Sequence, residues 1–135
     1  MIVLDCCAAV DIVRKTPEGN ALRMLIVEDE MVVSSGLFPI EAASTMNKLV
    51  RVGVLEAPIA ALLLRNAVDL VRTFVPITEN YIEAFNEGRR LNHSVYDMLY
   101  FTLARRNAAT LVTLDKRLRE ICEEQGVDCI HEVAF

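Results

Sequence analysis

The stretch Ala109-Thr110-Leu111-Val112-Thr113-Leu114-Asp115 decides the fold, because it is a short apolar run that ends on an acid. Its length and its aliphatic residues are typical of a strand buried on both faces of a sheet. The chain opens in the same way, since Ile2-Val3-Leu4 is followed at once by Asp5. We predict that the two strands are neighbours in one sheet and that both acids lie at its carboxyl edge.

Beyond these two strands, short apolar runs alternate with longer segments of helical period. This alternation predicts a three-layer α/β/α domain, whose central, mostly parallel sheet has four to five strands. The other strands are expected at residues 31–33, 74–77 and 128–130. The strand at 74–77 is expected near an edge, because Pro76 cannot donate to a neighbouring strand. Helices are expected at residues 8–14, 18–28, 39–52, 59–72, 79–91, 95–107 and 116–125.

Local signals mark the boundaries between these elements. The residues Ser34-Ser35-Gly36 predict a turn, and Thr78 is expected to cap the helix that follows it. Ser94 with Asp97 three residues later predicts a capping box, in which Asp takes the place of the usual Glu.

Length and composition restrict the class of protein. A chain of 135 residues, 53% of them hydrophobic, fits a single domain over residues 1–135. Its apolar runs are shorter than a membrane-spanning helix requires, so we expect a cytoplasmic protein that does not associate with membranes. The four cysteines and two histidines lack zinc-ligand spacing, and the five scattered glycines form no phosphate-binding loop. The cysteines are expected to be reduced and mostly buried.

The acids carry the functional information. The net charge of −5 argues against a protein that binds nucleic acid through a general positive coat. Four acids, however, follow strands or begin helices, and a parallel sheet brings such positions to one edge. They are Asp5, Glu41, Asp97 and Asp115. One or two Mg²⁺ or Mn²⁺ ions would relieve the repulsion between them through oxygen ligands alone. Taken singly, each acid is also explained as a helix cap or a first-turn acid.

The order of these residues resembles the PIN-domain ribonucleases, particularly the VapC-like toxins of toxin–antitoxin pairs. The resemblance covers nearly the whole chain. Its most specific part runs from Tyr96 to Leu118, where an acid, a Tyr three residues later, an Ala-bearing helix and a strand leading to Thr-x-Asp follow one another. The other matching stretches are residues 2–10 and 39–41.

The resemblance implies a metal-dependent endoribonuclease, in which metal-activated water cleaves RNA to leave a 5′-phosphate and a 3′-hydroxyl. It assigns Asp5, Glu41, Asp97 and Asp115 to the catalytic metal site and places Thr113 beside it. It also implies a homodimer and a protein antitoxin as partners. Two departures from the family pattern are Cys6-Cys7, where Ser or Thr is common, and Arg117, where many members have a further acid.

Basic residues near the predicted edge are candidates for binding phosphate groups of the substrate. Lys116 and Arg117 directly follow the last of the four acids. Further candidates within about three helical turns are Arg14, Lys15, Lys48 and Arg51. No side-chain nucleophile is required, and both histidines are expected to lie away from the four acids.

Two other functions remain open. A phosphatase or phosphotransferase of the haloacid-dehalogenase or receiver type also places Asp at the end of a first parallel strand. The former requires a second Asp two residues later, where this chain has Cys7, and the late Lys of receivers cannot be placed. A catalytically silent PIN-like interaction module is the alternative from another class, although it does not require all four acids.

Overall fold

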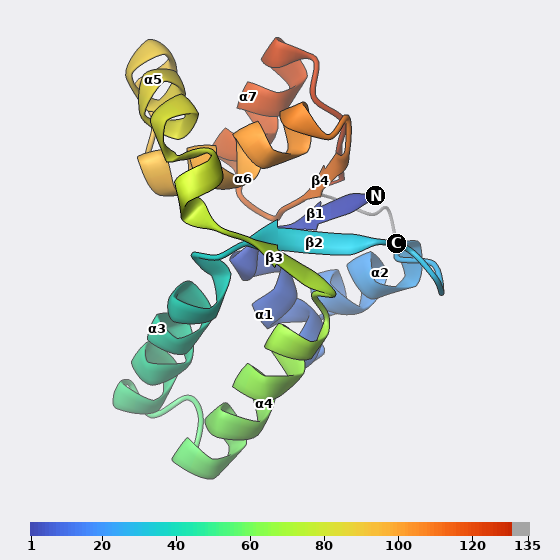
Figure 1. Ribbon diagram of the computed structural model, residues 1–135. Helices are drawn as coiled ribbons and strands as arrows, with labels where there is room; N and C mark the ends of the chain where they lie inside the picture. Colours follow the sequence, from blue (N-terminus) through green and yellow to red (C-terminus); the bar gives the residue numbers. More distant parts are fainter. Residues whose placement is uncertain (131–135) are drawn as a thin grey trace.

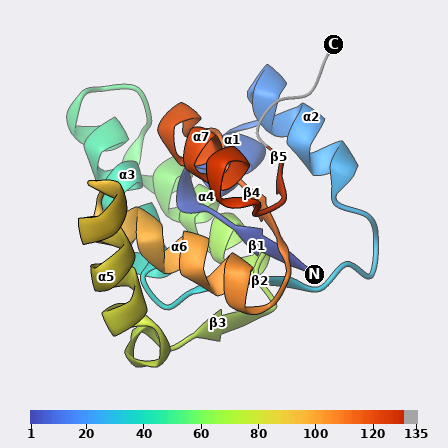
Figure 2. The ribbon, with the colours of Figure 1, turned by 90° about the horizontal axis from the view of Figure 1, so that it is seen from above.

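A computed structural model describes residues 1–130, in which five parallel strands form one sheet in the order β3-β2-β1-β4-β5 (Figures 1 and 2). The strands are β1 (Ile2–Leu4), β2 (Val32–Ser35), β3 (Thr73–Val75), β4 (Thr110–Val112) and β5 (Cys129–Ile130). Strand β1 pairs with both β2 and β4, so the strands that precede Asp5 and Asp115 are neighbours, as predicted. The predicted edge position of the strand before Pro76 is also confirmed, because β3 ends the sheet.

Helices cover both faces of this sheet, which confirms the three-layer α/β/α architecture (Figures 1 and 2). One face is covered by α1 (Cys6–Arg14), α2 (Pro17–Leu25), α3 (Phe38–Arg51) and α4 (Ala57–Asp69). The other is covered by α5 (Tyr81–Leu91), α6 (Val95–Arg106) and α7 (Lys116–Gln125). A short 3-10 helix, η1 (Ile77–Glu79), leads from β3 to α5. Within the described residues, no helix combines the length and the apolar character needed to cross a membrane.

Helix α6 is the central element of its layer, because it contacts β1, β2, β4, α5 and α7. Every residue from Met98 to Ala104 is buried, so this helix is apolar almost all round rather than along one stripe. Two of its polar groups are satisfied internally, since the Asn80 side-chain amide donates to the Leu99 carbonyl and to the Thr102 hydroxyl. This packing fixes the position of α6 and, with it, Asp97 in its first turn.

Several predicted boundaries are wrong for local reasons. Ser34 and Ser35 belong to β2 rather than to a turn, because the Ser34 hydroxyl donates to the Leu4 carbonyl at 2.6 Å and Ser35 pairs with Val75 of β3. Thr78 is not a helix cap, since it lies inside η1 and α5 begins only at Tyr81.

Helices α2 and α4 also end earlier than the predicted limits of residues 28 and 72. The backbone turns extended at Ile26 after α2. After α4, the Arg72 amide donates to the Val32 carbonyl at 2.8 Å, so the chain at Arg72 already runs beside β2. In both places, tertiary hydrogen bonding or extended backbone ends a segment whose apolar period alone would continue.

Candidate active site

A cavity of about 390 Å³ opens at the carboxyl edge of the sheet, where α1 and α3 begin. All four predicted acids line it: Asp5, Glu41, Asp97 and Asp115. They come from four different helices, whose first turns meet here because parallel strands end at one edge of the sheet. We call this hollow the acidic cavity.

Two of the acids are also helix caps, so capping a helix and lining the acidic cavity are compatible roles for one carboxylate. Asp5 is the N-cap of α1, and Asp115 is the N-cap of α7. One oxygen of Asp115, Oδ1, accepts hydrogen bonds from the amides of Arg117 and Leu118 at 2.9 and 3.1 Å. Capping therefore positions the Asp115 carboxylate and occupies only one of its two oxygens.

Asp5 is the most enclosed of the four acids, with 5% of its surface exposed. The buried Thr113 hydroxyl donates to Asp5 Oδ2 at 2.7 Å, so Thr113 lies beside this acid as predicted. Burial raises the pKa of the Asp5 carboxyl, and repulsion from Asp97 adds to the rise, while the Thr113 hydrogen bond opposes it. The ionised carboxylate is thus poorly compensated by the protein itself.

Glu41 is held by the phenol of Tyr100, which donates to Glu41 Oε1 at 2.5 Å. Tyr100 is fully buried within α6, so its ring packs in the core while its hydroxyl reaches the cavity. Burial raises the pKa of Glu41, the Tyr100 hydrogen bond lowers it, and the charge of Asp5 raises it further. The carboxylate of Glu41 again has a neutral partner rather than a cation.

Asp97 is held by a histidine, so the prediction that the histidines lie away from the four acids is wrong for His93. His131, the other histidine, lies outside the described residues. His93 Nε2 lies 2.8 Å from Asp97 Oδ2. Burial raises the pKa of Asp97, its contact with His93 lowers it, and the charge of Asp115 raises it. The predicted capping box is only half present: the Ser94 hydroxyl accepts from the Tyr96 amide at 3.2 Å, but the Asp97 carboxylate is directed to His93.

The chain between α5 and α6 explains why His93 reaches Asp97. Asn92 ends α5 in the left-handed conformation, with φ of 51°, and the His93 amide then donates to the Gly88 carbonyl at 2.9 Å. A Cβ atom on Gly88 would lie 3.0 Å from the His93 carbonyl oxygen, so glycine permits this close approach. The signal that could have revealed the contact is the spacing of four residues between His93 and Asp97 across the helix start.

The two cysteines that depart from the family pattern border Asp5. Cys7 is the exposed one of the four cysteines, and its Sγ lies 3.3 Å from Asp5 Oδ2 and 3.7 Å from Thr113 Oγ1. Cys6 is buried, and burial together with the charges of Glu41 and Asp5 raises its pKa to about 12. The pKa of Cys7 is raised as well, because its sulfur is enclosed beside the Asp5 carboxylate even though the residue as a whole is exposed. Both thiols therefore remain protonated at neutral pH and add no negative charge to the acidic cavity.

The basic residues predicted beside the site differ in their positions. Arg14 lines the acidic cavity. Arg117 is turned toward Glu120, with 3.3 Å between its guanidinium and the carboxylate. Neither Lys116 nor Arg117 is part of the cavity lining. Their contact with substrate stays a prediction.

The donor chemistry of the acidic cavity fits a hard divalent cation. Each carboxylate is held through hydrogen bonds from the chain, but Glu41 Oε2, Asp97 Oδ1 and Asp115 Oδ2 have no hydrogen-bond partner within residues 1–130. Oxygen ligands of this kind suit Mg²⁺ and Mn²⁺. As the side chains stand, no group of three or more His, Cys, Asp or Glu in the described part is close enough to hold an ion. Binding would therefore require the carboxylates to draw together.

Comparison with known proteins identifies the family. The solved crystal structure of PAE2754 from Pyrobaculum aerophilum is similar in fold, with a TM-score of 0.71 and 18% sequence identity over 88% of this chain and 84% of that one. Among curated proteins, none matches the chain. The sequence model of the PIN domain matches residues 2–124, which include all four acids of the cavity. This chain therefore belongs to the PIN domain family, whose members are in general nucleases that need a divalent metal.

Proposed function

We propose that this PIN domain is a Mg²⁺- or Mn²⁺-dependent endoribonuclease that hydrolyses RNA phosphodiester bonds with water. The observation that carries the proposal is the acidic cavity, where four carboxylates share one hollow and, within residues 1–130, the hydrogen bonds to them come from a hydroxyl, a phenol, an imidazole, a thiol and backbone amides. Such a site is disfavoured in the free protein and gains most from a bound cation.

The residues would divide the work between holding the ion and orienting its ligands. Asp5, Glu41, Asp97 and Asp115 would hold one or two ions, which lower the pKa of water and stabilise negative charge on the leaving oxygen. Thr113, Tyr100 and His93 each bond one oxygen of an acid and so restrict its rotation. The raised thiol pKa values of Cys6 and Cys7 make a cysteine nucleophile unfavourable, which supports water as the attacking group.

The proposed biological role is that of a VapC-like toxin, cytoplasmic, homodimeric and neutralised by a small protein antitoxin. Apart from the family resemblance, exposed apolar side chains at the end of α2 support an association surface there: Met24 is 86% exposed, and Leu25 is 43% exposed. Light scattering of the purified protein tests the dimer. A short reading frame directly upstream, whose product co-purifies with this chain and blocks its nuclease activity, would support the toxin role.

Cleavage of RNA by the purified protein tests the proposed activity. We expect Mg²⁺ or Mn²⁺ to support cleavage by the native protein and EDTA to abolish it. Asp97→Asn and Asp5→Asn should each reduce the rate by about a hundredfold or more, because loss of a ligand exceeds the 10–100-fold effect typical of its hydrogen-bond partners. Glu87→Gln, at a residue that does not line the acidic cavity, is the matched control and should cleave normally. Equal residual cleavage by all four proteins would contradict the proposal and favour a silent interaction module.

A further inference from the structure

A second hollow, of about 370 Å³, adjoins the acidic cavity on α3. It is lined by Ser44, Asn47, Lys48, Arg51 and Val52. Ser44 lines both hollows, so the two adjoin each other on α3. We call the second hollow the α3 hollow.

One face of α3 connects the acids to these basic residues. Glu41, Ser44, Lys48 and Arg51 follow one another at steps of three and four residues, which places them along one side of the helix. At about 1.5 Å per residue, Arg51 lies about 15 Å along the axis from Glu41. The charge along this face therefore changes from negative at the sheet edge to positive at the far end of α3.

Lys48 and Arg51 differ from the arginines on the opposite side of the molecule. Both are exposed, and neither has an ion pair or side-chain hydrogen bond within residues 1–130. By contrast, Arg90 and Arg105 each bond glutamates of α5. The two cations of the α3 hollow thus remain available to an external anion.

A competing path leads along α1 to Arg14, which lines the acidic cavity itself. Asp11 lines that cavity as well, one helical turn before Arg14. Its carboxylate would repel a phosphate on the way to Arg14, whereas no acid lines the α3 hollow. The α3 face is the better path for an anionic strand.

We propose that Lys48 and Arg51 bind backbone phosphates of a single RNA strand, next to the phosphodiester group that enters the acidic cavity. This inference rests on the proposed function and adds the course of the substrate across the surface. Ser44 and Asn47 supply neutral hydrogen-bonding groups between the two charged ends. An acidic protein segment is a poorer occupant, because the adjoining acidic cavity would bring it against four carboxylates. Contacts of this kind bind RNA without reading its sequence.

The salt dependence of RNA binding tests this inference separately from catalysis. Fluorescence anisotropy would follow a labelled 12-nucleotide oligouridine, with Ca²⁺ supplied in place of Mg²⁺ and strand integrity checked on a gel. Each lost phosphate contact should lower the slope of log affinity against log salt by about 0.7 for a single strand. We therefore expect Lys48→Ala with Arg51→Ala to lower the slope by about 1.4. The matched control is Arg65→Ala with Arg72→Ala, two exposed arginines of the α4 region, which should leave the slope unchanged.

Each outcome bears on a distinct claim. An unchanged slope for the Lys48 and Arg51 double variant, in a native protein that cleaves RNA, would overturn the inference and leave the proposed function standing. An equal fall in both double variants would also overturn it, because the effect would then be one of general charge. A native protein that neither binds nor cleaves RNA would overturn the proposed function, and this inference with it.

Discussion

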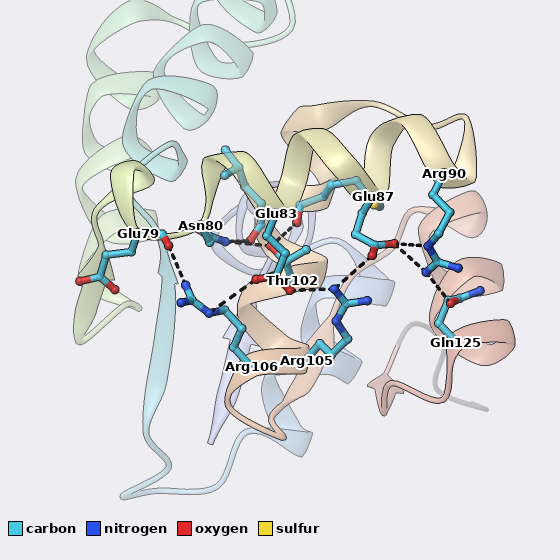
Figure 3. Close-up of polar contacts among 11 residues, drawn as sticks. Glu79, Asn80, Glu83, Glu87, Arg90, Thr102, Arg105, Arg106 and Gln125 are labelled. Atoms are coloured by element: carbon cyan, nitrogen blue, oxygen red, sulfur yellow. Dashed lines mark hydrogen bonds and ion pairs between the residues drawn. The ribbon is translucent and has the colours of Figure 1, made fainter.

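Carboxylates gather in two regions of this molecule, and they have different kinds of partner in each region. Between α5 and α6 they form an ion-pair network that consists of Glu83, Glu87, Arg90, Arg105 and Arg106 (Figure 3). Arg105 lies 2.7 Å from Glu83 and 3.3 Å from Glu87, and Arg90 donates to Glu87 at 2.8 Å. In the acidic cavity, the carboxylates are bonded instead by a hydroxyl, a phenol, an imidazole or backbone amides.

The two regions therefore differ in the pKa values of their acids. In the ion-pair network, burial acts to raise the pKa of Glu87, but Arg90 and Arg105 outweigh it and the pKa is lowered. In the acidic cavity, burial and mutual repulsion prevail, and the pKa values of Asp5, Glu41 and Asp97 are raised. Paired carboxylates stabilise the native fold at neutral pH, whereas unpaired ones destabilise it and leave their charge for a ligand.

The largest expected effect follows from removal of His93, whose imidazole is the only one bonded to an acid of the cavity within the described residues. His93→Ala removes the donor to Asp97 Oδ2, so the carboxylate loses its fixed orientation. We expect Mn²⁺ affinity to fall by about 10–100-fold, the usual consequence of losing a hydrogen-bond partner of a metal ligand. Paramagnetic resonance of free Mn²⁺ measures this. His93→Gln, whose amide can donate, should recover part of the affinity, and an unchanged affinity in His93→Ala would assign His93 a structural role only.

Substituting a cavity acid should stabilise the protein when no metal is present. Asp5→Asn removes an enclosed charge and keeps a residue that caps helices well. Thermal or urea unfolding in EDTA should show a gain of about 0.5–2 kcal/mol, the range typical of single stabilising changes, together with loss of activity. A clear loss of stability would show that Asp5 is compensated by the protein after all.

The same change of acid to amide in the ion-pair network should have the opposite sign. Glu87→Gln removes the charge that Arg90 and Arg105 share. We expect a loss of about 1 kcal/mol in the free energy of unfolding, since the pairs are partly exposed and screened. If the free energy of unfolding of this variant equals that of the native protein, the network contributes nothing measurable to stability, as is true of many surface ion pairs.

The smallest expected effect is a change with pH in the difference between the unfolding free energies of Asp5→Asn and the native protein. The raised pKa of Asp5 means that the folded state binds a proton at higher pH than the unfolded state does. The native protein therefore gains stability relative to the variant as the pH falls from neutrality through the folded pKa toward the ordinary carboxyl range. Urea unfolding in EDTA at several pH values should show that the greater stability of Asp5→Asn over the native protein becomes smaller as the pH falls. An advantage that grows instead would contradict the direction of the pKa shift.

The sequence predicted the parts of this structure that depend on short-range pattern. Apolar runs ending at Asp5 and Asp115 were enough to predict neighbouring parallel strands, because strand burial and helix capping leave clear local signals. The meeting of Glu41 and Asp97 with those acids followed from the geometry of parallel sheets. Their catalytic roles stay predictions.

Features that depend on the exact path of a turn were missed. The four-residue spacing of His93 and Asp97 is compatible with their contact, but the contact also depends on the left-handed Asn92 and on the close approach to Gly88, which spacing alone does not predict. Ser34 and Ser35 have turn-forming side chains, but their hydroxyls are satisfied inside the sheet edge by the Leu4 carbonyl and the Leu37 amide. In each case, a tertiary hydrogen bond decided what local propensity left open.

Calorimetric titration with Mn²⁺ tests most directly whether the acidic cavity takes its counter-charge from a metal ion. Three proteins are compared: native, Asp97→Asn from the cavity and Glu87→Gln from the ion-pair network. We predict that native and Glu87→Gln bind Mn²⁺ with equal affinity and that Asp97→Asn binds at least about a hundredfold more weakly, because loss of a ligand exceeds the effect of losing its hydrogen-bond partner. The absence of binding to the native protein, or equal binding to all three, would contradict a metal site at these carboxylates.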